Sequence, residues 1–164
     1  MKLIFDVETT GLDPVHDEIL QLAIIDQDKT VLFHDYFRPR GIKAWPEAQR
    51  INHISPDMVK GKKTFRQRRH EIQDIFNRAD ELIAYNTAFD MSFLAYGGIV
   101  FPDVPVSDPM LDFAPIYGEW NEYYYGYKWQ KLTTAAHYYN YEFAAHDSLE
   151  DVRATLHVYN ALHT

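Results

Sequence analysis

The sequence contains no cysteine, which excludes disulfide bonds and thiolate metal sites. No apolar run approaches the roughly 18 residues that a membrane-spanning helix needs. The first residues, MKLIFDVE, reach the acids Asp6 and Glu8 before a signal-peptide core could form. These absences predict a soluble, cytoplasmic protein with no membrane partner.

Positive charge is also scarce, because 16 Lys and Arg residues face 24 Asp and Glu residues, for a net charge of −8. This balance argues against a protein that coats nucleic acid by electrostatics alone, but not against an enzyme whose acidic site carries cations. Many of the basic residues gather in KGKKTFRQRRH, residues 60–70. Two interpretations stay open for this segment: a solvated helix face, which is the commoner case, or a contact with backbone phosphates.

Apolar side chains are plentiful. Hydrophobic residues make up 46% of the sequence, and 12 Tyr, 10 Phe and 3 Trp supply large units for burial. A chain of 164 residues is long enough for one substantial core. Because no repeat, linker or low-complexity segment interrupts it, we expect a single domain over residues 1–164.

The spacing of apolar residues predicts both strands and helices. Residues 2–8 alternate like a strand and end at a Thr-Gly-Leu-Asp-Pro turn. The segment 147–163 is the clearest helix, with a cap at Asp147 or Ser148 and apolar residues repeating at three and four. Further strands are expected at 18–26, 30–37, 81–85 and 104–106, and further helices near Pro46 and Ser55 and at 64–79, 88–98, 108–117 and 131–141. We therefore expect an α/β fold, with helices packed on the faces of a sheet.

The stretch FDVETTGL places two carboxylates, Asp6 and Glu8, inside an apolar strand. Side chains at i and i+2 of a strand point to the same face, so the two like charges would lie side by side and repel. This pattern indicates that a cation joins them, although such a triplet alone is weak evidence.

Two later segments carry acids in similar settings. YNTAFDMSFL places Asp90 at the start of a helix, where a carboxylate can simply complement the helix dipole. AHDSLED places His146 five residues before Asp151, and Asp151 adjoins Val152 in the apolar repeat. The alternative interpretation there is a helix cap followed by an exposed acid.

In order and residue type, FDVETTGL, YNTAFDMSFL and HDSLED resemble the three motifs of the DEDDh exonucleases, a group that includes proofreading subunits of bacterial DNA polymerases. The resemblance extends from Asp6 to Asp151. It implies a ribonuclease-H-like fold with a central mixed β-sheet flanked by α-helices. It also implies a 3′→5′ exonuclease that hydrolyses phosphodiester bonds at the 3′ end of single-stranded or frayed nucleic acid and releases nucleoside monophosphates, with DNA favoured over RNA and RNA left open.

The resemblance further implies two divalent metal ions, Mg²⁺ or Mn²⁺, which favour oxygen ligands. By this resemblance Asp6 contacts both metals, Glu8 and Asp151 complete the site of the attacking water, and Asp90 holds the second metal. His146 is then the general base, a role suited to imidazole near neutral pH. A single-stranded DNA or RNA 3′ end is the implied partner, together with a polymerase or another replication or repair protein.

By the same resemblance, Thr9, Thr10, Gly11 and Leu12 line the pocket for the terminal nucleotide, Phe89 packs near them and Asn86 orients neighbouring groups. The tyrosine-rich segment 117–129 has no counterpart in the motifs. A substrate platform, a local apolar cluster and a partner surface all stay open for it. An alternative function is a nucleic-acid-binding or polymerase-associated module with weak or no catalysis.

Overall fold

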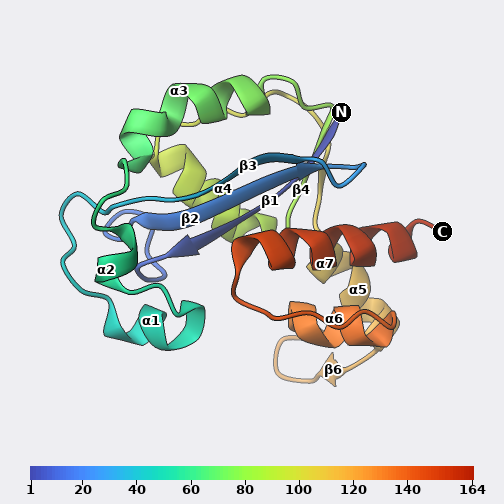
Figure 1. Cartoon of the computed structure of the whole chain (residues 1–164). Coiled ribbons are helices and arrows are strands. Elements are labelled where there is room, and N and C mark those ends of the chain that lie inside the picture. The colour runs from blue at the N-terminus through green and yellow to red at the C-terminus, as the bar shows by residue number, and fades with distance from the viewer.

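The computed structural model describes residues 1–164, and a five-stranded sheet forms its centre (Figure 1). The strand order is β3-β2-β1-β4-β5. β1 pairs antiparallel with β2 and parallel with β4, so the sheet is mixed, as expected. The strands are β1 Lys2–Thr9, β2 Ile19–Asp26, β3 Val31–Tyr36, β4 Glu81–Ile83 and β5 Val106–Ser107.

Seven helices surround this sheet. Figure 1 shows α3 and α4 on one side of the sheet and α7 on the other. The helices are α1 Pro46–Asn52, α2 Pro56–Val59, α3 Phe65–Phe76, α4 Thr87–Tyr96, α5 Pro109–Tyr117, α6 Leu132–Tyr138 and α7 Ser148–Leu162. None of these helices combines the length and apolar character that a membrane crossing requires.

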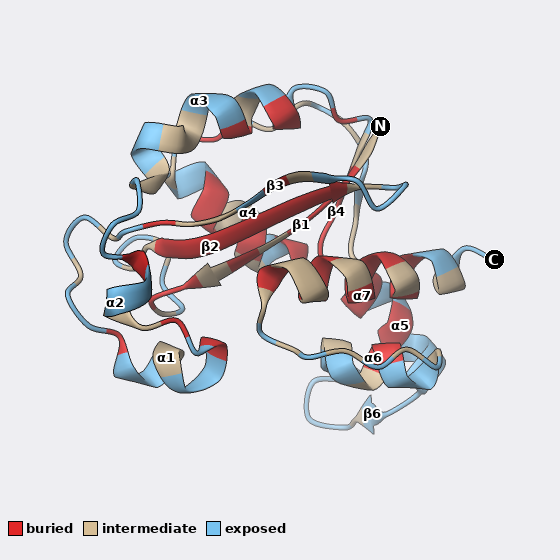
Figure 2. Ribbon diagram, in the orientation of Figure 1, coloured by how far each residue is buried: buried red, intermediate tan, exposed pale blue.

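The alternation along β1 decides which side chains meet which helices. Leu3 and Phe5 belong to the core cluster that includes residues of α3 and α4. Ile4 belongs to the second cluster, with Val152 and Leu156 of α7. Because Asp6 and Glu8 continue the even-numbered series, they point to the α7 side of the sheet. Figure 2 shows this central part of the sheet as buried.

Several elements are shorter than the sequence pattern suggested. The strand expected at 81–85 contains only three residues, Glu81–Ile83. The one expected at 104–106 is displaced to Val106–Ser107, so only Val106 of the expected segment lies in it. The helix expected over 64–79 ends at Phe76, because the chain tightens into a turn in which the Arg78 N–H bonds to the carbonyl of Ile75. The tyrosine-rich segment forms a small antiparallel hairpin, β6 Trp120–Asn121 and β7 Gly126–Tyr127.

Candidate active site

The two carboxylates of the first motif lie beside β2. Asp6 is paired with Ala23 and Glu8 with Gln21 across the ladder between β1 and β2. The Oδ2 atom of Asp6 is buried and has no hydrogen-bond partner. An unpartnered buried carboxylate oxygen is costly, so it indicates a cation at this point.

Asp90 reaches the same strand from α4. Its Oδ1 atom accepts a hydrogen bond of 2.9 Å from the backbone N–H of Val7, and only 2% of the residue is exposed. The start of α4 is held by Asp108, whose carboxylate accepts bonds from the backbone N–H groups of Asn86 and Thr87 at 3.0 and 2.9 Å. Asp90 is therefore fixed against β1 rather than being an exposed helix-terminal charge.

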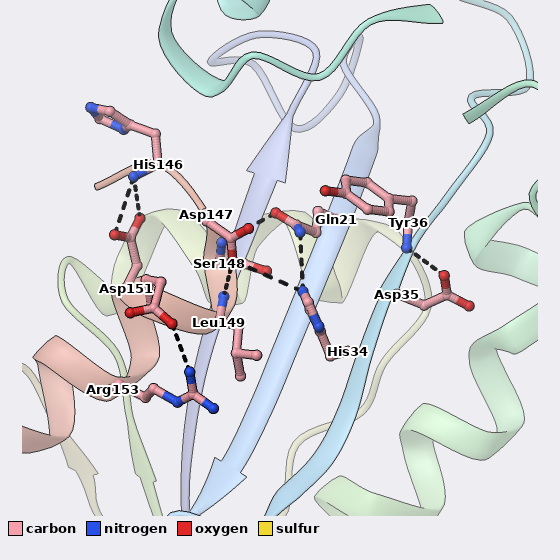
Figure 3. A network of polar contacts seen from close by, with 11 residues as sticks. Gln21, His34, Asp35, Tyr36, His146, Asp147, Ser148, Leu149, Asp151 and Arg153 are labelled. Carbon is pink, nitrogen blue, oxygen red and sulfur yellow. Dashed lines mark hydrogen bonds and ion pairs between the residues drawn. The ribbon is translucent and has the colours of Figure 1, made fainter. Parts of the chain in front are cut away.

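Asp151 is supplied by α7, which is anchored to the sheet at its first residue. The backbone N–H of Ser148 donates to the side-chain oxygen of Gln21 on β2 at 3.1 Å (Figure 3). Asp147 caps the helix, because its side chain accepts a hydrogen bond from the N–H of Leu149. It is one of the two residues expected as the cap. This anchoring buries Asp151, which is 7% exposed, against the face that carries Glu8.

His146 lies directly before α7. It has a φ of 71°, a left-handed conformation that is uncommon outside glycine. Its backbone N–H donates to both carboxylate oxygens of Asp151 at 3.2 Å, as Figure 3 shows. One ligand atom from each of Glu8, His146 and Asp151 lies within 4.8 Å of the others. The structure thus brings together residues from the first and third motifs.

The carboxylates of this cluster are held in surroundings that disfavour their charged forms. Burial, followed by repulsion from Asp90, Asp151 and Glu8, raises the pKa of Asp6 well above its usual range. Burial likewise raises the pKa of Asp90. It raises the pKa of Glu8 to about 9 and that of Asp151 to about 7. These acids keep their protons to higher pH than ordinary carboxyl groups, and a cation bound among them would favour their charged forms.

The donor atoms fit a hard divalent cation. The four acids offer oxygen ligands, which Mg²⁺ and Mn²⁺ prefer, and the chain contains no thiol that would favour a softer metal. Asp6 contributes an oxygen that no protein group satisfies. The group whose ligand atoms lie within 4.8 Å of one another contains Glu8 and Asp151, and Asp6 and Asp90 are not members of it.

The loop after β1 is shaped by its own polar side chains. Thr9 Oγ1 donates to the carbonyl of Gly11 at 2.6 Å, and Thr10 Oγ1 donates to Asp17 at 3.0 Å. The Asp17 carboxylate fills the space that a Cβ on Gly11 would occupy, so a larger residue there would displace the Asp17 side chain. Leu12 is 84% exposed next to these residues. The Leu12 side chain is therefore not part of the hydrophobic core.

Phe89 and Asn86 lie at the start of α4. The Phe89 ring is half-buried and packs on Phe93, with ring centroids 5.0 Å apart. Asn86 has a φ of 72°, and its side chain does not cap the helix. Its hydrogen bond to Asp108 comes from the backbone N–H. An orienting role for the Asn86 side chain stays a prediction.

Sequence reasoning missed three residues around the cluster, namely Asn52, His53 and Lys131. Asn52 is buried, and its side-chain amide donates to the carbonyl of Thr9 at 3.2 Å. Burial lowers the pKa of His146, and the nearby His53 and Lys131 lower it further. The only sequence signal for such a role was the polar Asn52 within the segment INHIS, residues 51–55. Nothing in the sequence around Lys131 points to this site.

Comparison with known proteins places these features in context. The RNase_T model of an exonuclease family matches residues 3–159. The DNA polymerase III subunit epsilon of Treponema pallidum (strain Nichols) is 31% identical over 119 residues, covering 66% of this chain and 51% of that protein. A PolC-type DNA polymerase III of Streptococcus thermophilus (strain ATCC BAA-491 / LMD-9) is 30% identical over 112 residues, covering 67% of this chain and 8% of that protein. The chain therefore spans about half, or much less, of the length of these relatives.

Solved structures share the fold at lower identity. Exonuclease X in complex with 5′ overhanging duplex DNA has a TM-score of 0.70 and 18% identity, covering 99% of this chain and 90% of that chain. Escherichia coli exonuclease I in complex with a dT13 oligonucleotide has a TM-score of 0.80 and 21% identity, covering 99% of this chain and 41% of that chain. With the mixed sheet and flanking helices, these likenesses confirm the expected ribonuclease-H-like α/β fold.

Proposed function

The chain belongs to the exonuclease family whose model matches residues 3–159, and from that membership we propose that it is a metal-dependent 3′→5′ exonuclease. It acts on the 3′ end of single-stranded or frayed nucleic acid and releases nucleoside monophosphates. The observation that carries this proposal is the convergence of Asp6, Glu8, Asp90, Asp151 and His146 from separate elements on one end of β1. We also propose that the whole chain acts as a single exonuclease domain.

The four acids of the cluster hold two divalent cations, Mg²⁺ or Mn²⁺. Asp6, Glu8, Asp90 and Asp151 would supply the oxygen ligands for these cations. When bound, such cations stabilise the negative charge that develops on the attacked phosphate and the leaving oxygen. The unpartnered oxygen of Asp6 and the raised pKa of each acid support this assignment.

His146 acts as the general base and accepts a proton from the attacking water at a ring nitrogen. Its ring must be neutral to accept that proton. Burial and the nearby positive groups lower the pKa of His146, which favours the neutral form near pH 7. The bonds from its backbone to Asp151 keep the residue beside the acids.

The terminal nucleotide binds against the loop formed by Thr9, Thr10, Gly11 and Leu12. The exposed Leu12 side chain packs on the last base, and Phe89 contributes an aromatic surface nearby. Asn86 orients neighbouring groups at the start of α4. The internal hydrogen bonds of the loop support this role, because they fix its shape before the substrate arrives.

DNA is the proposed substrate, with a polymerase or another replication or repair protein as partner. Relatives named as DNA polymerase III components, and structural neighbours solved with DNA, support both statements. Discrimination against RNA depends on contacts to the 2′-hydroxyl, which experiment must test directly.

The test uses 5′-labelled single-stranded DNA, duplex DNA and RNA of one sequence, each with Mg²⁺, Mn²⁺ or EDTA. We expect a ladder of products shortened from the 3′ end, dependent on metal and strongest with single-stranded DNA. Immediate release of the labelled 5′ nucleotide would contradict the direction of cleavage. Tight binding with no cleavage in either metal would contradict the enzyme and favour the binding module.

A further inference from the structure

Four arginines line one pocket on the side of the sheet opposite α7. Arg38 and Arg40 follow β3, and Arg66 and Arg69 belong to α3. The pocket has a volume of about 460 Å³ and is bounded by residues of the loop after β1, by Ile19 at the start of β2 and by the end of α4. Its basic lining is unexpected in a chain with a net charge of −8.

None of these four arginines forms an ion pair, whereas their neighbours do. Lys62 and Arg68 both pair with Asp35, at 3.0 and 2.8 Å, and Arg68 also pairs with Glu71. The structure thus divides the basic segment 60–70. Arg68 forms an ion pair within the protein. Arg66 and Arg69 form none and line the pocket.

The two acids of the pocket accept hydrogen bonds from groups other than the arginine side chains. Asp17 accepts bonds from the Thr10 hydroxyl and the Asp13 N–H. Glu18 accepts bonds from the backbone N–H groups of Arg40 and Gly41. The pocket therefore keeps an excess of two positive charges, with the guanidinium donors of the arginines not committed to either acid.

The floor of the pocket is closely packed. Arg69 lies over Gly98, where an added Cβ would be 3.0 Å from its Nη1 atom, and the Phe65 ring lies over Gly97. Phe93 and Tyr96 of α4 also line the pocket. Guanidinium groups beside aromatic faces are the combination that binds phosphates and bases of nucleic acids.

We propose that this pocket binds backbone phosphates of a nucleic-acid strand whose 3′ end lies at the acidic cluster, an inference that rests on the proposed function. The helix α4 joins the two places, because Asp90 is in its first turn and Tyr96 at its end. Six residues of helix span about 9 Å, or about three nucleotides at 3.4 Å each in a stacked strand. The pocket supplies the attraction for a polyanion that the acidic cluster lacks.

The test measures binding without cleavage. A fluorescein-labelled 12-nucleotide single-stranded DNA is titrated with the full chain in EDTA at several salt concentrations. The test variant is Arg40→Gln with Arg66→Gln, because both side chains are exposed and can be replaced without disturbing the core. The matched control is Arg50→Gln with Arg78→Gln, which removes two exposed, unpaired arginines outside the pocket.

We expect the test variant to weaken binding about tenfold or more at low salt. The slope of log K against log salt should flatten by about 1.4, since each lost single-strand phosphate contact removes about 0.7. The control should change both quantities far less. Equal slopes for wild type, variant and control would overturn the proposal, as would a wild-type chain that does not bind the oligonucleotide.

A second measurement separates a strand from a free nucleotide as the source of the phosphate. With Mg²⁺, the test variant should show a raised KM on the 12-nucleotide strand but nearly wild-type kinetics on a dinucleotide, which is too short to reach the pocket. If thymidine monophosphate or inorganic phosphate, at the same concentration as the strand, displaces the strand, the pocket binds free phosphates. That result would overturn the proposal that it binds a strand. A wild-type chain that cleaves neither the 12-nucleotide strand nor the dinucleotide would contradict the proposed function, while the EDTA titration would still decide the pocket.

Discussion

The backbone N–H of His146 bonds to both carboxylate oxygens of Asp151, each at 3.2 Å. One proposed metal ligand thereby fixes the backbone of the proposed general base. The His146 ring is not used in this contact, so it stays available to the attacking water. Base and ligand are positioned by one short segment at the start of α7 (Figure 3).

Replacing His146 with alanine should lower kcat by about 10²–10⁴-fold, the usual contribution of general-base catalysis. Metal binding should survive, because the four acids remain. Thermal melting with added Mn²⁺ checks the second point, and steady-state kinetics at saturating metal checks the first. A variant with wild-type kcat would exclude the base role and leave HDSLED as a helix cap with one metal-binding acid.

Activity should rise with pH as His146 loses its proton, with the midpoint below the ordinary value of 6.5. Burial, then His53, then Lys131 lower the pKa of His146, and bound cations act in the same direction. Lys131→Gln removes one of these charges, so the acid limb of the kcat profile should move to higher pH. Lys128→Gln is the control, because Lys128 pairs with Glu119. A profile that Lys131→Gln leaves in place would contradict this electrostatic account.

Asp6→Asn should abolish cleavage while leaving the metal-free protein as stable as wild type or more so. The substitution removes a buried acid whose charged form is repelled by its neighbours. Melting temperature is measured in EDTA and again with Mg²⁺, which should stabilise wild type but not the variant. Asp74→Asn on the exposed side of α3 is the control for loss of one charge. Retained cleavage in Asp6→Asn would refute the assignment.

The metal-free protein should lose stability as the pH rises from about 5 to 9. In this range the unfolded chain has already released protons, since ordinary carboxyl pKa values are about 4, while the folded cluster still holds them. The stabilisation is complete below the unfolded values and is lost as the pH passes about 7 for Asp151 and about 9 for Glu8. Urea unfolding across pH in EDTA measures this slope, which Mg²⁺ should reduce. Rising stability over the same range would contradict it.

Gly11→Ala should destabilise the protein by about 1–3 kcal/mol, because the new methyl group overlaps the Asp17 carboxylate. The loop must then shift, so KM for the 3′ end should rise as well. Gly41→Ala is a matched control, since nothing lies within 4 Å of its added Cβ. Chemical denaturation and steady-state kinetics distinguish the two, and equal behaviour of both variants would show that the Asp17 contact does not shape the loop.

The local pattern of residues was sufficient to predict the structure wherever a single segment determines its own conformation. The alternation of residues 2–8 predicted β1 and the shared face of Asp6 and Glu8. The repeat at three and four in α7 predicted the side that packs on the sheet. In both cases the periodicity of burial is a direct consequence of backbone geometry. The ordered motifs then predicted the family, although the roles of the individual site residues remain proposals.

Tertiary structure decided what depends on residues far apart in the chain. The interpretation of segment 60–70 could not be settled locally, because Asp35 on β3 neutralises Arg68 while Arg66 points to a pocket shared with Arg38. The contact of Asn52 with Thr9 likewise joins residues 43 positions apart. Periodicity describes which face of an element is buried, but a charge is free or neutralised only according to its neighbours in space. That distinction required the folded chain.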